Sequence, residues 1–169
     1  MKKNLIGILV IISILFIGWQ SKEKKFDAES KVDIVKNEFP EAKKEIQQTL
    51  DGIFKSIQDK DADKLISYHA YGPKFTEFRD AAPRFNSAEN EEFERGFVGA
   101  ISAFDYELVD LQINVFGEVA VVTFLNDFRP TIDGNVMQLW GQVTLVFVKT
   151  KGEWKITHEH HSALNKEHS

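Results

Sequence analysis

From Pro40 onward the hydrophobic residues recur with the 3.6-residue period of an amphipathic helix. Pro40 followed by Glu41 is a typical helix start, because proline suits the first turn and an acidic side chain complements the helix dipole. The apolar stripe of this first helix comprises Ile46, Leu50, Ile53, Phe54 and Ile57. The spacing therefore predicts a long first helix.

Two shorter helical segments are expected next. Asp61 is the expected cap of a segment around Leu65, and the Gly-Pro pair at 72–73 must end it. Ser87 is the expected N-cap of a third helix, since acidic residues fill the turn that follows it. Its predicted apolar face comprises Phe93, Phe97, Ala100, Ile101 and Phe104.

After Asp105 the chain is rich in β-branched and aromatic residues, which favours strands. Short hairpin signals separate the segments at Gly117-Glu118, Asp133-Gly134 and Lys151-Gly152. Four strands are expected, over residues 106–116, 118–132, 136–150 and 153–164. Three helices followed by an antiparallel meander predict an α+β domain.

The N-terminus has the composition of an export signal. Residues 1–21 begin with two lysines and continue as an apolar run over 5–19, which at roughly 22 Å of helix is shorter than a membrane core of roughly 30 Å. Trp19 stands where a bacterial lipoprotein signal would have its cysteine, so lipidation there is impossible. We predict an exported, periplasmic or extracytoplasmic protein held at the membrane by residues 5–19, with a polar tether over 22–40, a domain over 41–164 and a tail over 165–169.

Net charge and composition limit the classes of binding partner and of catalytic chemistry that this protein can use. The net charge of −5 and the scarcity of basic runs argue against nucleic acid. With no cysteine in the sequence, a disulfide framework, a thiol nucleophile and a Cys-ligated metal are excluded. Catalysis would have to use His, Asp, Glu, Tyr, Ser, Lys or Arg.

The C-terminal strand carries three histidines in four positions. Strand alternation places Trp154, Ile156, His158, His160 and Ser162 on one face, and Lys155, Thr157, Glu159 and His161 on the other. The first face begins apolar and ends polar, so it is expected to run from the core into a cavity. On this pattern His158 and His160 point inward, and at least one of the two rings is expected to bond to a polar group of the helical layer such as Tyr68 or His69. His161 is expected outside the cavity or at the dimer face.

These features together resemble the SnoaL-like branch of the nuclear transport factor 2-like superfamily. The resemblance rests on the helical start, the "DKDADKL" turn, "GEVAVVTF", "GQVTLVFVKTKGEWKI" and the W-x-I-x-H-x-H-x-S arrangement at 154–162. It implies a cone-shaped fold, in which three N-terminal helices pack on a curved antiparallel sheet around an internal pocket. It also implies a homodimer formed through the sheet, and Gln138, Trp140, Gln142 and Thr144 share a strand face suited to that contact.

Two hypotheses for the function remain, because proteins with this fold include both enzymes and binding modules. The first is a non-catalytic module that binds a small apolar or amphipathic molecule or serves as a dimeric scaffold. The alternative is an isomerase or lyase of the ketosteroid isomerase or polyketide cyclase type, which uses histidine, aspartate or tyrosine as acid and base without a cofactor. An acid/base residue other than the strand histidines at the closed end of the pocket would distinguish them.

The candidate residues follow from these hypotheses. Catalytic candidates are His158, His160, Asp127 and Tyr68, and the expected ligand-binding residues are His158, His160, Ser162, Tyr68 and His69. No metal site is predicted, because the H-x-H pair needs at least a third ligand that only His69 or a distant carboxylate could supply.

Overall fold

The computed structural model describes residues 32–164 of the 169-residue chain. The predicted signal or anchor segment over 1–21, the first part of the tether and the tail over 165–169 lie outside the described residues. Within residues 32–164, no helix is long and apolar enough to cross a membrane.

The three predicted helices are present. They are α1 (Pro40–Gln58), α2 (Ala62–Ile66) and α3 (Ser87–Ala100). The predicted stripe of α1 is buried, and Asp61 caps α2 by accepting a hydrogen bond from the backbone N–H of Lys64 at 2.9 Å.

Both ends of α3 differ from the prediction. Its N-cap is Asn86 and not Ser87, because Asn86 and Glu89 form a reciprocal capping box. The helix ends at Ala100 and not at Phe104, since the backbone of Ile101 is already extended and begins a strand.

The sheet has six strands. They are β1 (Thr76–Arg79), β2 (Ile101–Phe116), β3 (Val119–Ile132), β4 (Asn135–Val136), β5 (Leu139–Thr150) and β6 (Glu153–Ala163). The strand order is β1-β6-β5-β3-β2, with the short β4 paired to β3. The meander of the four long strands confirms the α+β prediction, whereas β1, which pairs parallel to β6, was not predicted.

Two tight turns support the meander as the sequence predicted. Asp133-Gly134 and Lys151-Gly152 both have positive φ angles, between 50° and 82°, at the tips of their hairpins. Two successive residues with positive φ give a turn whose twist matches that of the flanking strands.

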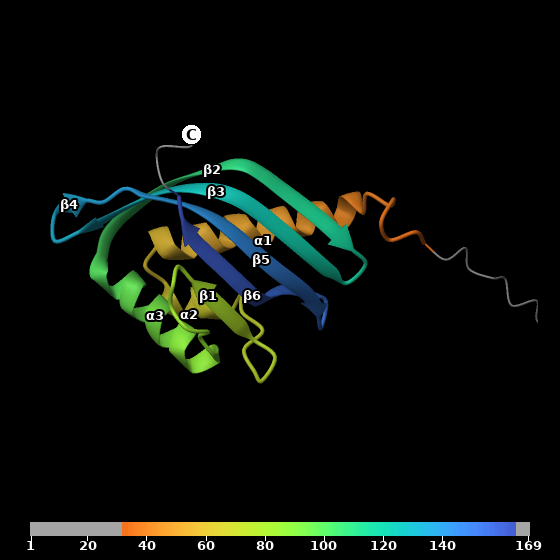
Figure 1. Ribbon diagram of the computed structural model, residues 1–169, viewed down its shortest axis with the longest axis horizontal. Helices are drawn as coiled ribbons and strands as arrows, with labels where there is room; N and C mark the ends of the chain where they lie inside the picture. The colour runs from red at the N-terminus through yellow and green to blue at the C-terminus, as the bar shows by residue number, and fades with distance from the viewer. Residues whose placement is uncertain (1–31, 165–169) are drawn as a thin grey trace, which may run out of the picture. The chain divides into compact units, whose positions relative to one another are not determined.

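The long strands curve, and the helices lie on the concave side of the sheet (Figure 1). The interior between the two layers is apolar, with α1 residues such as Leu50 and Phe54 facing sheet residues such as Phe124 and Phe147. The parallel pairing with β6 places β1 beside the C-terminal strand although about 80 residues separate them in the chain (Figure 1).

An irregularity in β6 decides which residues face this interior. The register with β5 shifts between Val146, which pairs with His158, and Phe147, which pairs with Ile156, so Thr157 is an extra residue. An extra residue reverses the alternation of all side chains beyond it. Ile156 and Glu159 are therefore both buried, although they are three positions apart.

Candidate functional site

A cavity of about 500 Å³ lies on the concave side of the sheet, and its volume is in the size range of small-molecule sites. Most of its wall is apolar and aromatic, with contributions from α1, α3 and the inner faces of β2, β3 and β5. Polar and charged side chains also line the cavity. They are His69, Arg79, Asp80, Glu94, Asn126, Gln138, Glu159, His161 and Ser162.

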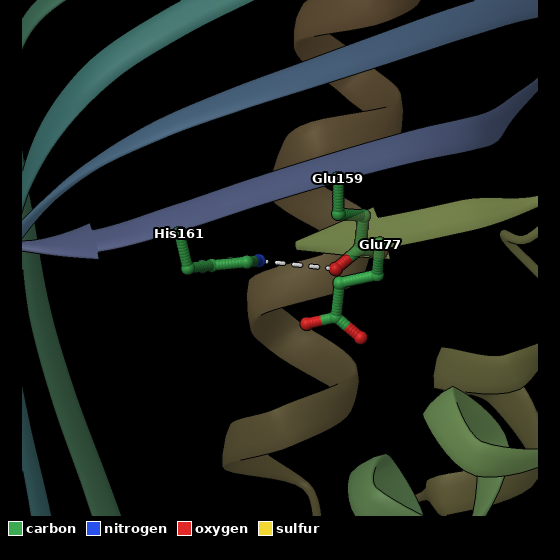
Figure 2. Close-up of side chains that lie close together, drawn as sticks. All are labelled: Glu77, Glu159 and His161. Atoms are coloured by element: carbon green, nitrogen blue, oxygen red, sulfur yellow. Dashed lines mark hydrogen bonds and ion pairs between the residues drawn. The ribbon is translucent and has the colours of Figure 1, made fainter. Parts of the chain in front are cut away.

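Glu159 is the centre of this polar group. Its side chain is 4% exposed, and its two oxygens accept from different imidazoles. His69 Nε2 lies 2.7 Å from Oε1, and His161 Nε2 lies 3.0 Å from Oε2. Figure 2 shows Glu159 and His161 projecting from β6 to the same side, next to Glu77 of β1.

Local backbone pairing brings His69 to this position. The segment after α2 pairs with β6, since the Ile156 N–H donates to the Tyr68 carbonyl at 2.8 Å and the Ala70 N–H donates to the Ile156 carbonyl at 2.7 Å. The His69 ring stacks on Tyr71, with ring centroids 5.0 Å apart.

Both nitrogens of His69 face acceptors. Nδ1 lies 3.2 Å from the Leu65 carbonyl oxygen and Nε2 faces the Glu159 carboxylate. Because neither partner can donate when Glu159 is ionised, the doubly protonated ring satisfies the site. Burial lowers the pKa of His69, but the hydrogen bond to Glu159 and the nearby negative charges outweigh burial and raise it.

His161 is held differently. Its Nε2 donates to Glu159, while Nδ1 has no hydrogen-bond partner within the described part of the chain. Burial lowers the pKa of His161, and the hydrogen bond to Glu159 more than compensates, so the pKa is raised. This is the arrangement of an acid/base histidine, with one nitrogen oriented by a carboxylate and the other left for a ligand.

The pKa of Glu159 itself moves down. Burial alone would raise it, but the hydrogen bonds from His161 and His69 hold it well below the ordinary range of a carboxyl group. Glu159 is therefore a fixed negative charge that orients the two rings.

Glu94 of α3 titrates in the opposite direction. Burial and the negative charge of Glu159 raise its pKa to about 7, although His69, Arg79 and His161 lower it in part. Two carboxyl groups in one cavity thus have pKa values pushed in opposite directions, which is typical of acid/base sites.

A second polar group lies beside the first and consists of the buried Glu77 and Asn90 and the half-buried Arg79 and Tyr71. Tyr71 donates its hydroxyl hydrogen to Asn90 Oδ1, and Asn90 Nδ2 donates to Glu77 Oε2 at 2.8 Å. The other Glu77 oxygen forms an ion pair with Arg79 Nη2. Burial and the surrounding carboxylates raise the pKa of Tyr71.

Glu77, Glu159 and His161 also place one potential metal-ligand atom each within 4.8 Å of one another (Figure 2). All four carboxylate oxygens already have partners, from Arg79, Asn90 and the two imidazoles. A divalent cation would have to displace these donors and tolerate the Arg79 charge next to Glu77. The donor set therefore fits an internally neutralised acid/base group better than a metal centre.

The prediction that His158 and His160 point into the cavity is wrong. The extra residue at Thr157 turns both rings to the other face of the sheet, where His158 Nδ1 contacts the Thr76 hydroxyl at 2.8 Å and His160 is exposed. Phe78 lies against both rings. For the same reason His161, which was expected outside, lines the cavity.

Two further candidates do not line the cavity. Tyr68 packs against α1, where a Cβ at Gly52 would lie 2.2 Å from its hydroxyl oxygen. Asp127 is 3% exposed and is engaged by Arg129 at 3.0 Å and by Gln138. Asp127 lies outside the cavity because the inner position on β3 belongs to Asn126, one residue earlier.

Other predicted residues are placed closer to expectation. His69 lines the cavity, and Ser162 borders both the cavity and a second hollow on the outer face, where its hydroxyl contacts His160. Of the strand face assigned to a dimer contact, Thr144 and Gln142 lie opposite the buried Val143 and Leu145. The other two members, Gln138 and Trp140, contribute to the cavity wall instead.

Sequence reasoning missed the acidic half of the site. Glu94 was not among the predicted site residues, and Glu77 and Arg79 lie on a strand that the pattern did not predict. The T-E-F-R alternation at 76–79 and the i, i+4 spacing of Asn90 and Glu94 were the available signals, but short segments of this kind are common on surfaces.

Comparisons with known proteins agree with this fold. The family model of the SnoaL-like domain matches residues 46–166, and the chain belongs to this family. It is thus a SnoaL-type protein with the nuclear transport factor 2-like fold. A comparison with curated proteins returned no match.

Solved structures with the same fold include proteins with different assigned roles. A proposed dehydratase of the NTF2-like family from Streptomyces avermitilis is 16% identical, with a TM-score of 0.68 over 75% of this chain and 98% of that one. An NTF2-like superfamily protein from Salmonella enterica serovar Typhimurium is 22% identical, with a TM-score of 0.66 over 75% and 94%. A proposed scytalone dehydratase from Novosphingobium aromaticivorans is 11% identical, with a TM-score of 0.65 over 75% and 86%. At these identities the likeness concerns the fold.

Proposed function

We propose that the protein is a lyase or isomerase that transfers protons on a small, largely apolar substrate without a cofactor. The observation that carries the proposal is the Glu159–His161 hydrogen bond, which orients one ring nitrogen and leaves Nδ1 for a ligand in the cavity. Glu94, whose pKa is about 7, supplies a second group that can exchange a proton at neutral pH. The likeness in fold to two proposed dehydratases supports the lyase reaction.

The roles follow from the charges. Ionised Glu94 removes a proton from the carbon next to a substrate carbonyl, and the electrons of that C–H bond form a double bond. In a dehydration the C–O bond to a β-hydroxyl breaks, and the leaving oxygen takes the Nδ1 proton of His161 and departs as water. In an isomerisation the same proton goes to the far carbon. Transfer of the proton from Glu94 back to His161 resets the site.

The apolar wall favours the same chemistry. A weakly hydrated cavity raises the proton affinity of carboxylates and strengthens each electrostatic interaction with a bound substrate. The non-catalytic hypothesis is less well supported, because acid/base groups beyond the strand histidines, Glu94 and Glu159, lie in the cavity wall.

Hydrogen–deuterium exchange tests the proposal without a known substrate. The chain from residue 26 is incubated in D₂O with a bicyclic ketone such as 2-tetralone, and NMR follows loss of the proton next to the carbonyl. Exchange that depends on His161 and Glu94, and not on His160, supports the proposal. A panel of ketones that binds in the cavity without any catalysed exchange would instead identify a binding module. Stoichiometric zinc that survives a mild chelator wash and depends on Glu77 and His161 would identify a metalloenzyme.

We further propose that the protein is exported and held at the outer face of the membrane by residues 5–19. The support is the lysine-started apolar run of the sequence. Fractionation of cells that express the full chain tests this. Recovery of the chain in the soluble cytosolic fraction would refute it.

A further inference from the structure

Arg79 lies near two carboxylates, Glu77 and Glu94, and contacts Glu77 more closely. Its Nη2 forms a close ion pair with Glu77, whereas the distance from Nη2 to Glu94 Oε1 is 3.7 Å. The guanidinium also lies over the Phe93 ring, 3.2 Å from the ring centroid. One further N–H group of Arg79, at Nη1, is buried with no hydrogen-bond partner in the described residues, so Glu94 does not accept from it.

Two short sequence spacings create this arrangement. Glu77 and Arg79 are two positions apart on β1 and therefore share a face of that strand. Asn90 and Glu94 are four positions apart on α3 and therefore share a face of that helix. Asn90 is hydrogen-bonded to Glu77, and Glu94 lies within ion-pair distance of Arg79.

Hydrogen bonds from Tyr71 to Asn90 and from Asn90 to Glu77 hold the Glu77 side chain in place. It is completely buried, as is Asn90, and one of its oxygens accepts from the Asn90 amide at 2.8 Å. The Asn90 carbonyl accepts in turn from the Tyr71 hydroxyl, so both ends of the amide are engaged. The other Glu77 oxygen, Oε1, takes no part in these hydrogen bonds and forms the ion pair with Arg79.

We propose that Glu77 and Asn90 are positioning residues, which keep Arg79 bound to Glu77 and so leave Glu94 able to take up and release a proton in the cavity. A guanidinium in full hydrogen-bond contact with Glu94 would stabilise its ionised form and make it a poor proton carrier. The inference rests on the proposed function, since it explains how the second proton-transfer group of that reaction is kept competent.

The other charged and titratable groups around Glu94 come from three elements. They are His69 and Tyr71 from the segment after α2, Arg79 from β1, and Glu159 and His161 from β6. His69 and His161 are hydrogen-bonded to Glu159, whereas Arg79 forms its close ion pair with Glu77. A substitution at Glu77 therefore removes the anionic partner of Arg79, while His69 and His161 keep their hydrogen-bond partner Glu159.

Glu77→Gln tests the proposal in the full chain. Glutamine keeps the shape, and rotation of the Asn90 amide keeps the hydrogen bonds, but Arg79 loses its anionic partner. The readout is the ¹³C NMR titration of the Glu94 carboxyl group, assigned by comparison with Glu94→Gln and measured without substrate. We expect the ratio of ionised to neutral Glu94 at pH 7 to rise about tenfold. A crystal structure of the variant should show Arg79 in hydrogen-bond contact with Glu94.

A charge-conserving variant separates positioning from net charge. In Glu77→Gln combined with Asn90→Asp, the negative charge is kept but moves one residue away from Arg79. The amide introduced on β1 can donate to the carboxylate introduced on α3, so the hydrogen bond between the two positions is retained. The same rise in ionised Glu94 is expected. A wild-type titration in this folded double variant, or in Glu77→Gln alone, would overturn the proposal.

Glu91→Gln is the matched control. Glu91 lies one turn before Glu94 on α3 and pairs with Arg95 at the surface, so its removal should leave the Glu94 titration unchanged. An equal shift in this control would show a general effect of helix charge and would also overturn the proposal. The titration is independent of turnover. If it responds as expected while the wild type exchanges no substrate proton, the positioning role stands and the proposed reaction fails.

Discussion

His69 precedes Glu159 by 90 positions in the chain, yet its Nε2 lies 2.7 Å from Glu159 Oε1 and both side chains are almost fully buried. Breaking such a pair leaves an uncompensated group in the interior. We expect Glu159→Gln to lower the free energy of unfolding by about 3 kcal/mol in urea titrations. The surface pair of Lys55 and Asp59 is the control, and Asp59→Asn should cost less than about 1 kcal/mol. Equal effects would contradict a structural role for the buried pair.

The raised pKa of Glu94 predicts a pH-dependent stability. Its pKa is about 7 in the folded protein, whereas the ordinary value is 4.5. Between pH 4.5 and pH 7, Glu94 therefore keeps its proton in the folded state but has lost it in the unfolded state. The contribution of Glu94 to stability therefore falls as pH rises from 4.5 to 7 and stays low above that. Glu94→Gln removes this loss. The variant should be more stable than wild type at pH 8 by at most about 3 kcal/mol, with little difference at pH 4. A difference that does not change between these pH values would refute the shift.

The two histidines on opposite faces of β6 should behave differently. We expect His161→Asn to reduce proton exchange on a bound ketone by about 10²- to 10⁴-fold, which is the usual contribution of a general acid or base. His160→Asn changes an exposed ring on the outer face, so exchange should stay close to wild type. NMR exchange rates at saturating ketone make the comparison, and the reverse order would show that His160 reaches the cavity.

Replacing both His158 and His160 with Phe tests the corrected orientation through ligand binding. Neither ring lines the cavity, so the affinity for a ketone that occupies it should remain within about twofold of wild type, or about 0.4 kcal/mol. Calorimetric titration measures this. A large loss of affinity without a change in melting temperature would show that His158 or His160 contacts the ligand and would contradict the orientation given above.

We propose that the outer face of the sheet forms a homodimer. Val109, Phe116 and Val119 are large apolar residues left 38% to 41% exposed on β2 and β3, more than a purely solvated surface needs. Leu125→Arg places a charge on the outer side of β3, opposite the inner Phe124, and should give monomers in light scattering. Gln48→Arg on the exposed side of α1 should leave the dimer intact. A monomeric wild-type chain from residue 26 would refute the dimer.

The amino-acid pattern determined the elements whose residues interact locally. The α1 stripe, the Asp61 cap and the Asp133-Gly134 and Lys151-Gly152 turns depend on neighbours within a few positions, so spacing and residue type are sufficient to predict them. The arrangement of helices before an antiparallel meander then defined the fold class.

Tertiary structure alone decided which side chains form the site. One extra residue at Thr157 exchanges His158 and His160 for Glu159 and His161 on the inner face, and strict alternation contains no signal for it. β1 exists because its four residues pair with β6 far along the chain, and this pairing brings Glu77 beside Glu159. The pKa of Glu94 depends on burial and on charges from β1, β6 and the segment after α2. Such long-range relationships arise only when the layers pack, because burial and charge proximity are properties of the folded chain.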